Sequence, residues 1–186
     1  MALTDLSGVV LADLTLRPDD RGEFVETYRR SWVSSMPSVV QANLSRSRAG
    51  VIRGLHFHRR QSDYWCLIEG QAFVALADLR VGSPTFRQVR TSPFDAGASM
   101  QGLYVPAGVA HGICAITAIT LQYLVDAYFT GDDEFGVAWD DPDLAVAWPV
   151  NDPVVSERDR ANPSLTEVLR DPPPFDGLRE GPAFDG

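Results

Sequence analysis

The sequence predicts an all-β fold, and three observations lead to this expectation. The fifteen glycines and thirteen prolines are scattered along the chain rather than clustered. They separate short runs rich in valine, leucine, isoleucine and aromatic residues, which is typical of a β-sandwich or β-barrel. Several of these runs alternate between apolar and polar residues, as strands with one buried face do.

The expected strands follow one another with well-marked turns between them. Proline, glycine and aspartate concentrate in residues 17–22, 81–84 and 140–143, as they do in turns. Residues 31–36 and 163–169 have apolar spacing for one or two helical turns each, and Ser164 is a suitable N-cap for the second. The predicted strands are residues 9–16, 22–29, 38–45, 64–79, 86–90, 102–105, 113–128 and 137–139.

Composition bounds the size and the partners of the protein. A chain of 186 residues and 20.4 kDa has the length of one domain. We expect that domain to occupy residues 1–170, followed by a loose tail rich in proline, glycine and aspartate over residues 171–186. The net charge of −9 and the pI near 4.7 argue against nucleic acid or an anionic membrane surface as the main partner.

The cysteine content and the hydropathy favour an intracellular protein. Two cysteines, Cys66 and Cys114, are too few for a disulfide framework. The apolar runs fall far short of the roughly 20 residues of a membrane-spanning helix, and the N-terminal residues lack the pattern of a secretory signal. We therefore expect the protein in the reducing cytoplasm.

All three histidines lie in two short segments, which favours a shared site. His56 and His58 are two residues apart, so their side chains project from the same face of a strand. His111 lies in the second segment, residues 106–112. Imidazoles titrate near neutral pH and serve as bases, acids or metal ligands, so we expect the histidines to face one cavity.

Both histidine segments resemble the two signatures of the cupin superfamily. The first signature is matched in spacing, with aspartate where glutamate is usual, by Gly50, His56, His58, Asp63 and Gly70. The second is matched in part by Pro106, Gly108 and His111, while Ala115 stands where asparagine is expected. This resemblance implies a cupin jelly roll with short peripheral helices.

A closer resemblance covers roughly residues 10–165. Two of its segments read Gly-Val-Ile-Arg-Gly-Leu-His (50–56) and Val-Pro-Ala-Gly-Val-Ala-His-Gly (105–112). In order along the chain, seven segments are similar to the dTDP-4-dehydrorhamnose 3,5-epimerase family: residues 20–26, 41–45, 50–56, 74–86, 105–112, 137–144 and 156–159. Seven matches in one order make the resemblance specific, although each one alone is weak.

The resemblance implies a reaction and the residues that perform it. A proton is removed at C3 and/or C5, beside the C4 ketone of a nucleotide-linked 6-deoxysugar, and is returned on the opposite face. By resemblance His56 is the base and Asp159 orients it, because a carboxylate on one ring nitrogen fixes the tautomer of the other. Tyr123 is the matching acid, and Arg53 with His111 holds the enolate oxygen. No cofactor is expected.

One position departs from the family pattern. Asp63 stands where the family has a lysine, and a carboxylate there repels an enolate. In one solution, Arg53 and His111 hold the oxygen without it. In the other, a divalent ion binds to Asp63 and the three histidines, as in a metal-dependent cupin isomerase or oxygenase. The two solutions compete, because a metal-bound His56 cannot accept a substrate proton.

The resemblance also implies substrate contacts and a partner. The substrate is a nucleotide-diphosphate sugar, and a neighbouring subunit's arm reaches the pocket, which makes a homodimer with strand exchange part of the hypothesis. In that arm Arg21 meets the diphosphate, and Phe24 and Glu26 contact the base. The other predicted substrate contacts are Gln41, Asn43, His58, Asp63, His111 and the base-stacking Phe129. A protein that binds a nucleotide sugar without turnover is a further alternative.

Overall fold

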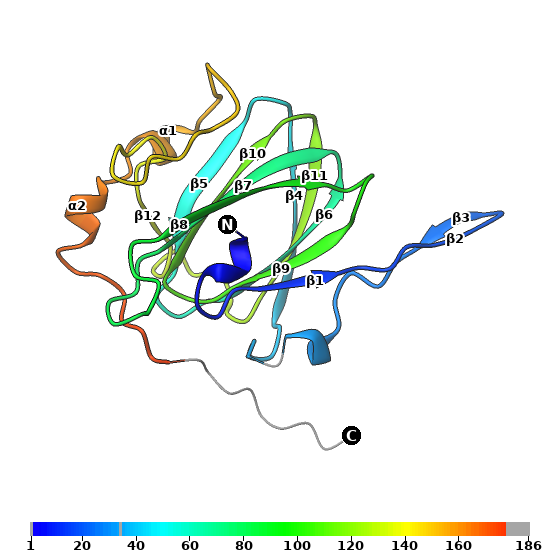
Figure 1. The fold of residues 1–186 in the computed structure, drawn as a ribbon, viewed down its shortest axis with the longest axis horizontal. Coiled ribbons are helices and arrows are strands. Elements are labelled where there is room, and N and C mark those ends of the chain that lie inside the picture. The colour runs from blue at the N-terminus through cyan, green and yellow to red at the C-terminus, as the bar shows by residue number, and fades with distance from the viewer. Residues whose placement is uncertain (1, 34, 178–186) are drawn as a thin grey trace.

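Two five-stranded antiparallel sheets face each other in a jelly roll, which confirms the predicted all-β class (Figure 1). The computed structural model describes residues 2–33 and 35–177. The first sheet has the order β1 (Val10–Asp13), β9 (Gln101–Val105), β6 (Asp63–Glu69), β11 (Ile119–Val125), β4 (Gln41–Ser47). The second has the order β12 (Phe135–Gly136), β5 (Ile52–Phe57), β10 (Val109–Ala115), β7 (Gln71–Asp78), β8 (Val89–Asp95).

From β4 to β7 and from β8 to β11, successive strands alternate between the two sheets. This alternation is the connectivity of a jelly roll, and it places residues close in sequence on opposite walls of the interior. The main core fills one end of the interior with apolar side chains from both sheets, such as Leu67, Val74 and Leu103. Removing these side chains from water is the chief favourable term in folding.

Shorter segments cover the outer faces of both sheets. The second sheet is covered by the chain around α2 (Leu165–Val168), whose Leu165 packs with Leu55 and Ala77. The first sheet is covered near η2 (Arg30–Trp32), where Val33 and Met36 pack on Tyr64 and Tyr104. The 3-10 helix η1 (Leu3–Asp5) contributes Leu3 to the main core.

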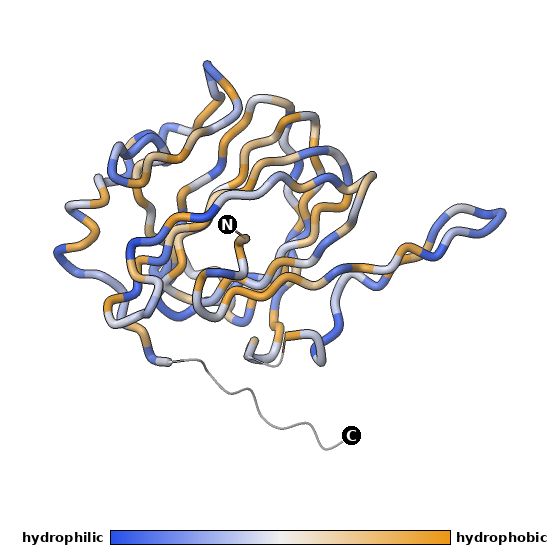
Figure 2. The backbone as a smooth tube through the Cα atoms, viewed as in Figure 1, coloured by the Kyte–Doolittle hydropathy of each residue, from blue (hydrophilic) through white to orange (hydrophobic). Residues whose placement is uncertain are grey.

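A two-stranded hairpin projects from the body of the molecule. It consists of β2 (Arg17–Asp19) and β3 (Gly22–Phe24), and all six residues are exposed. Figure 1 shows it extending away from both sheets, and Figure 2 shows that its tip is hydrophilic. A ribbon with no apolar face against its own chain is marginally stable in water, so it is suited to contact another surface.

Two predicted strands are wrong because each contains a turn between strands of different sheets. Residues 64–79 form β6 and β7, which meet at Gly70, and residues 113–128 begin within β10 and continue into β11. Gly70 has a φ of +85°, and a Cβ there would collide with the carbonyl oxygen of Ala118. These turns could not be located from the sequence. A continuous apolar run is compatible with one long buried strand or with two buried strands joined by a tight turn.

Other predicted elements also differ from the structure: residues 137–139 follow β12 and form no strand, and the helical segment predicted over 31–36 is the 3-10 helix η2. The strand predicted over 22–29 ends at Phe24, and the one predicted over 86–90 is shifted to Val89–Asp95. The helix α2 begins as predicted after Ser164, whose side chain accepts a hydrogen bond from the Glu167 backbone in a capping box. The sequence reasoning missed α1 (Glu157–Arg160), since four residues are too few for a periodic pattern.

The C-terminal segment is partly tied to the body, contrary to the expected loose tail. Pro174 forms a bridge with Val81, and the Phe175 backbone N–H donates to the Val81 carbonyl. The guanidinium of Arg80 lies 5.1 Å from the Phe175 ring centroid, a cation–π contact. The rest of the predicted tail, residues 178–186, lies outside the described residues.

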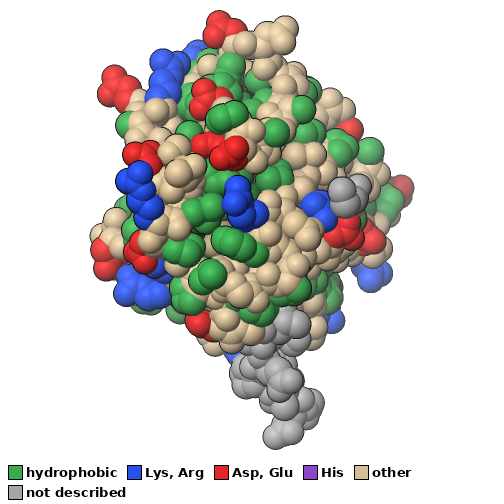
Figure 3. Space-filling view, turned by 60° about the vertical axis from the view of Figure 1, so that its left-hand side comes forward, with side chains coloured by type: hydrophobic (Ala, Val, Ile, Leu, Met, Phe, Trp, Pro, Cys, Tyr) green, Lys and Arg blue, Asp and Glu red, His purple; other side chains and the backbone are tan. Residues whose placement is uncertain are grey.

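Charged side chains of both signs are interspersed over the face that carries α1 and α2, with no extended basic patch (Figure 3). A sequence-independent nucleic-acid surface needs a basic patch or stripe. None of the described helices has the length and apolar character needed to span a membrane.

Both cysteines are free and buried, which predicts low reactivity. Burial raises the pKa of the Cys66 thiol to about 11 and also raises the pKa of Cys114. Because the thiolate is the reactive form, we expect neither cysteine to react with a disulfide reagent within minutes at pH 8 in the native protein. Both react at once in denaturant, as absorbance of the released thiol will show. Rapid modification of the native protein would contradict this packing.

Candidate functional site

A cavity of about 720 Å³ lies between the two sheets, beside the main core. Alternate residues of β4 face it, as the period of a strand requires, namely Gln41, Asn43 and Ser45. The opposite wall comes from β5 and β10, and the segment before α1 closes one side. All three histidines line this cavity, as predicted.

His56 and Asp159 form a close pair in the cavity wall. The Nε2 atom of His56 lies 2.7 Å from Oδ1 of Asp159, and the Gly54 backbone N–H donates to Oδ2 at 3.2 Å. Burial opposes ionisation of Asp159, but the hydrogen bond and charge of His56 and the Gly54 N–H hold its pKa below the usual value. An ionised carboxylate only accepts, so Nε2 carries the ring proton and Nδ1 keeps a lone pair.

Local distortion of β5 brings Arg53 and His56 to the same wall. Three residues apart, they would face opposite sides of a regular strand, but the pairing of β5 with β10 shifts register between His111 and Ile113. Such a bulge re-aims side chains. Gly54 has a φ of +116°, and a Cβ there would lie 2.6 Å from the His111 carbonyl oxygen, so the close approach of the strands requires glycine.

His58 and His111 have their ring nitrogens fixed by backbone carbonyls. Nδ1 of His58 donates to the Asp133 carbonyl at 2.7 Å, and Nδ1 of His111 donates to the Val109 carbonyl at 3.0 Å. A carbonyl oxygen can only accept, so both Nδ1 atoms are protonated. Burial lowers the pKa of His111 to about 4, although the charge of Asp63 opposes this. His111 is therefore neutral at pH 7 and presents an Nε2 lone pair.

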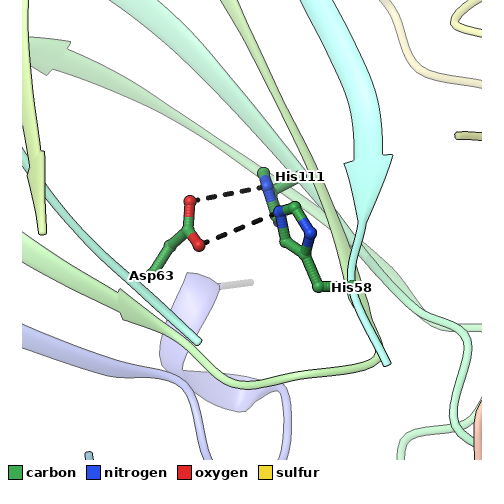
Figure 4. Close-up of side chains that lie close together, drawn as sticks. All are labelled: His58, Asp63 and His111. Atoms are coloured by element: carbon green, nitrogen blue, oxygen red, sulfur yellow. Dashed lines mark ion pairs between the residues drawn. The ribbon is translucent and has the colours of Figure 1, made fainter. Parts of the chain in front are cut away.

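Asp63 faces both of these rings from the opposite sheet (Figure 4). Its Oδ1 atom lies 3.9 Å from Nε2 of His58, and its Oδ2 atom lies 3.8 Å from Nε2 of His111. The carboxylate accepts hydrogen bonds from the Gln61 amide at 2.9 Å and from the Trp65 indole at 3.1 Å. Within residues 2–33 and 35–177, no arginine forms an ion pair with it.

Tyr123 and Arg53, the other predicted catalytic residues, also line the cavity. Burial raises the pKa of the Tyr123 hydroxyl, and the charges of Asp63 and Glu134 act in the same direction, so the phenol stays protonated. Arg53 donates from Nε to the Ser47 hydroxyl at 2.9 Å and from Nη2 to the Arg46 carbonyl at 3.3 Å. Tyr123 belongs to the first sheet and His56 to the second, so they face each other across the cavity.

Gln41, Asn43 and Phe129 lie together at the cavity, as predicted. The Gln41 amide donates to Asn43 Oδ1 at 2.8 Å and accepts from the Phe129 backbone N–H at 3.2 Å. The ring of Phe129 is exposed. Polar groups beside an exposed aromatic ring are suited to a ligand with both hydroxyl groups and a flat ring.

The structure does not bring Arg21, Phe24 and Glu26 to this cavity. Arg21 pairs with Asp19 at 2.6 Å, and Glu26 pairs with Arg29. Phe24 is exposed at the end of β3. These residues belong to the projecting hairpin and the chain after it (Figure 1), so they cannot complete the pocket of their own chain.

Sequence reasoning missed the residues that hold the short loop after β5. The Asp133 carboxylate accepts the backbone N–H groups of Arg59, Arg60 and Gln61 at 3.0 to 3.1 Å. No local motif signals this, since Asp133 is more than 70 residues away in the chain. The Trp65 indole donates to Asp63, and a pair between Arg158 and Glu134 at 2.6 Å borders the cavity.

The predicted four-ligand metal set needs a correction. The ligand atoms that lie within 4.8 Å of one another belong to His58, Asp63 and His111. His56 is not among them, and its Nε2 atom is engaged by Asp159. The competition between base and ligand that the sequence suggested is therefore absent.

Comparison of the sequence and the fold with known proteins identifies the family of this chain. The family model described as dTDP-4-dehydrorhamnose 3,5-epimerase matches residues 3–167. The dTDP-4-dehydrorhamnose 3,5-epimerase of Streptomyces griseus is 37% identical over 174 residues, 89% of this chain and 86% of that protein. The dTDP-4-dehydrorhamnose 3-epimerase of Streptomyces niveus is 38% identical over 160 residues, 82% and 77% of the two chains.

A solved structure of a relative supports the same family. The 3,5-epimerase of Legionella pneumophila in complex with dTDP-4-keto-L-rhamnose superposes with a TM-score of 0.85 at 27% identity, covering 92% of this chain and 96% of that one. Sequence likeness over most of the chain and the same fold thus accompany the His56 and Asp159 pair in a sheet-lined cavity. The chain belongs to the dTDP-4-dehydrorhamnose 3,5-epimerase family, a family of isomerases.

Proposed function

We propose that this protein epimerises a nucleotide-linked 4-keto-6-deoxysugar at C3, at C5 or at both carbons. The single observation that carries the proposal is the placement of a base and an acid on opposite walls of one cavity. His56 comes from β5 of the second sheet and Tyr123 from β11 of the first. Inversion of a carbon requires proton removal from one face of the sugar and delivery to the other.

His56 takes the proton from carbon. Its Nε2–H is held by Asp159 at 2.7 Å, so Nδ1 is the atom with a lone pair on a ring that lines the cavity. Asp159 is buried and ionised, and it stabilises the imidazolium that forms when the proton arrives. The sugar is left as an enolate, with its negative charge on the C4 oxygen.

Tyr123 returns a proton on the opposite face. Its pKa is raised, so the phenol is protonated at neutral pH. No protein group in residues 2–33 and 35–177 binds its hydroxyl, which leaves that hydroxyl available to a ligand. Arg53 supplies positive charge for the enolate oxygen from the same wall as the base. His111 has its Nδ1 proton engaged by Val109, so its Nε2 accepts rather than donates.

The nucleotide lies at the mouth of the cavity. Phe129 is exposed there and suits stacking on a base, while Gln41 and Asn43 suit sugar or phosphate oxygens. A homodimer completes the pocket: the projecting hairpin of one chain carries Arg21 to the diphosphate of its partner's substrate, and Phe24 and Glu26 to the base. The complexed relative, with dTDP-4-keto-L-rhamnose, supports this class of substrate.

The proton transfers use side chains alone and need no organic cofactor. We expect the enzyme in the reducing cytoplasm, in keeping with two free buried cysteines.

Product analysis tests the proposal. The purified protein is incubated with dTDP-4-keto-6-deoxyglucose, the ketones are reduced with borohydride, and the released 6-deoxysugars are separated by chromatography. We expect new stereoisomers inverted at C3, at C5 or at both carbons. Unchanged sugar configuration, together with saturable binding of the substrate by calorimetry, would instead assign a protein that binds the nucleotide sugar without turnover.

A further inference from the structure

We propose that His58, Asp63 and His111 bind one divalent transition-metal cation inside the cavity. The three side chains come from three places in the fold: the end of β5, the start of β6 and the middle of β10. Asp63 belongs to one sheet, and His111 belongs to the other, which His58 directly follows after β5, so the cluster bridges the two walls (Figure 4). His56 takes no part in it.

The three groups turn ligand atoms toward one another, all within 4.8 Å. Nδ1 of His58 and Nδ1 of His111 donate to backbone carbonyls, so in each ring Nε2 is the atom that faces Asp63. The two Nε2 atoms lie 3.9 and 3.8 Å from the oxygens of Asp63. The Gln61 amide lies 3.2 Å from Nε2 of His58 and donates to Asp63 Oδ1 at 2.9 Å, and a cation that binds all three side chains takes the place of this amide.

The surroundings do not supply that cation. Asp63 is 4% exposed, His111 5% and His58 8%. The sequence contains no lysine, and among the described residues the cavity is lined by only two arginines, Arg53 and Arg158. Neither arginine forms an ion pair with Asp63: Arg158 pairs with Glu134, and Arg53 donates to the Ser47 hydroxyl and keeps its charge for the enolate oxygen.

The donor set fits a metal. A cation about 2.0–2.2 Å from each ligand keeps its ligands about 3.0–3.5 Å apart, and the two carboxylate–imidazole distances of 3.9 and 3.8 Å are only slightly longer. Metal-binding histidines almost always donate their second ring N–H to a carbonyl or carboxylate, as His58 and His111 do here. Two imidazoles and one carboxylate suit iron, cobalt, manganese, nickel or zinc in the divalent state.

The position of the site suggests its purpose, and this part rests on the proposed function. Asp63 occupies the place where the family pattern has a lysine. A divalent cation with one carboxylate ligand leaves one net positive charge, as the lysine does. When bound, the metal supplies a Lewis acid for the substrate's C4 oxygen, while His56 and Asp159 keep their own roles.

Binding of Co²⁺ to the chelator-treated, desalted full-length protein tests the site. Visible d–d absorption bands should appear and saturate at one Co²⁺ per chain. Asp63→Asn, which conserves shape, and His58→Ala should each weaken binding at least about tenfold, with circular dichroism showing that each variant is folded. The matched control is His56→Asn, which removes the third histidine of the cavity and should bind Co²⁺ as the wild type does.

Each outcome decides the proposal. Absence of the absorption bands in the wild type, or bands that survive in both ligand variants, would overturn it. Loss of Co²⁺ binding in His56→Asn would overturn the three-ligand assignment in favour of a site that includes His56. Deuterium exchange into the substrate, measured separately with Co²⁺ and with EDTA, distinguishes the two hypotheses. Co²⁺ binding without exchange under either condition would contradict the epimerase, whereas full exchange without Co²⁺ binding would contradict only the metal site.

Discussion

Replacing His56 with asparagine is expected to lower kcat for epimerisation by about 10²–10⁴-fold, the usual contribution of a positioned general base. Asparagine fills much of the same space but cannot accept a proton from carbon. Substrate binding should change little, because the nucleotide contacts lie at the cavity mouth, so KM stays within a few-fold of the wild-type value. Steady-state rates from product chromatography check this split between kcat and KM.

Asp159→Asn provides the companion experiment. The carboxylate holds the Nε2–H tautomer of His56 at 2.7 Å, whereas an amide can turn its NH₂ group to the ring and favour the other tautomer. We expect kcat to fall strongly, while the variant protein remains folded. Nitrogen NMR of the histidine ring should show that the proton has moved to Nδ1. An active Asp159→Asn enzyme with an unchanged tautomer would contradict the assigned role of this pair.

Replacing Asp78 with alanine is expected to lower the free energy of unfolding by about 3–5 kcal/mol, because it leaves a buried arginine without its partner. Asp78 is 0% exposed and Arg80 4%. The guanidinium donates to both carboxylate oxygens at 2.8 and 2.7 Å, and the hydroxyls of Ser83 and Thr85 each donate at 2.6 Å. Urea denaturation followed by tryptophan fluorescence measures the loss.

The chain contains a matched control for this substitution. Asp19 and Arg21 form the same pair two residues apart, but on the exposed hairpin. Asp19→Ala should therefore leave the urea midpoint almost unchanged, since exposed ion pairs contribute little. Equal effects of the two substitutions would show that burial does not govern the strength of these pairs.

The effect of Asp78 should also depend on pH. Burial opposes its ionisation, but the hydrogen bonds from Arg80, Ser83 and Thr85 hold its pKa below the usual value of an aspartate. A carboxyl with a lowered pKa in the folded state stabilises the protein above the unfolded pKa and loses that contribution as the pH falls through the folded value. The difference between wild type and variant should be full at pH 7 and shrink below about pH 4.

Much of the site was predictable because its residues are marked by type and spacing. His56 and His58 share a wall because of the two-residue period of strands, and Asp159 was identified by family resemblance far along the chain. The turns at Gly70 and between β10 and β11 were not predictable, because short turns inside buried apolar runs leave almost no compositional trace.

The electrostatics of the site could not be predicted from sequence either. Which nitrogen of His58 and His111 carries the proton depends on backbone carbonyls at Asp133 and Val109, and carbonyl positions have no sequence signature. The separation of His56 from the other two histidines follows from the bulge and the pair with Asp159. Sequence spacing alone placed all three in one ligand set.

The most direct measurement is deuterium incorporation when dTDP-4-keto-6-deoxyglucose is mixed with the protein in heavy water and followed by proton NMR. We predict that the C3 or C5 proton signal disappears with the wild-type enzyme and persists with His56→Asn at the same concentration. Persistence of both signals with the wild type, or equally fast exchange by the two proteins, would contradict carbon deprotonation by His56.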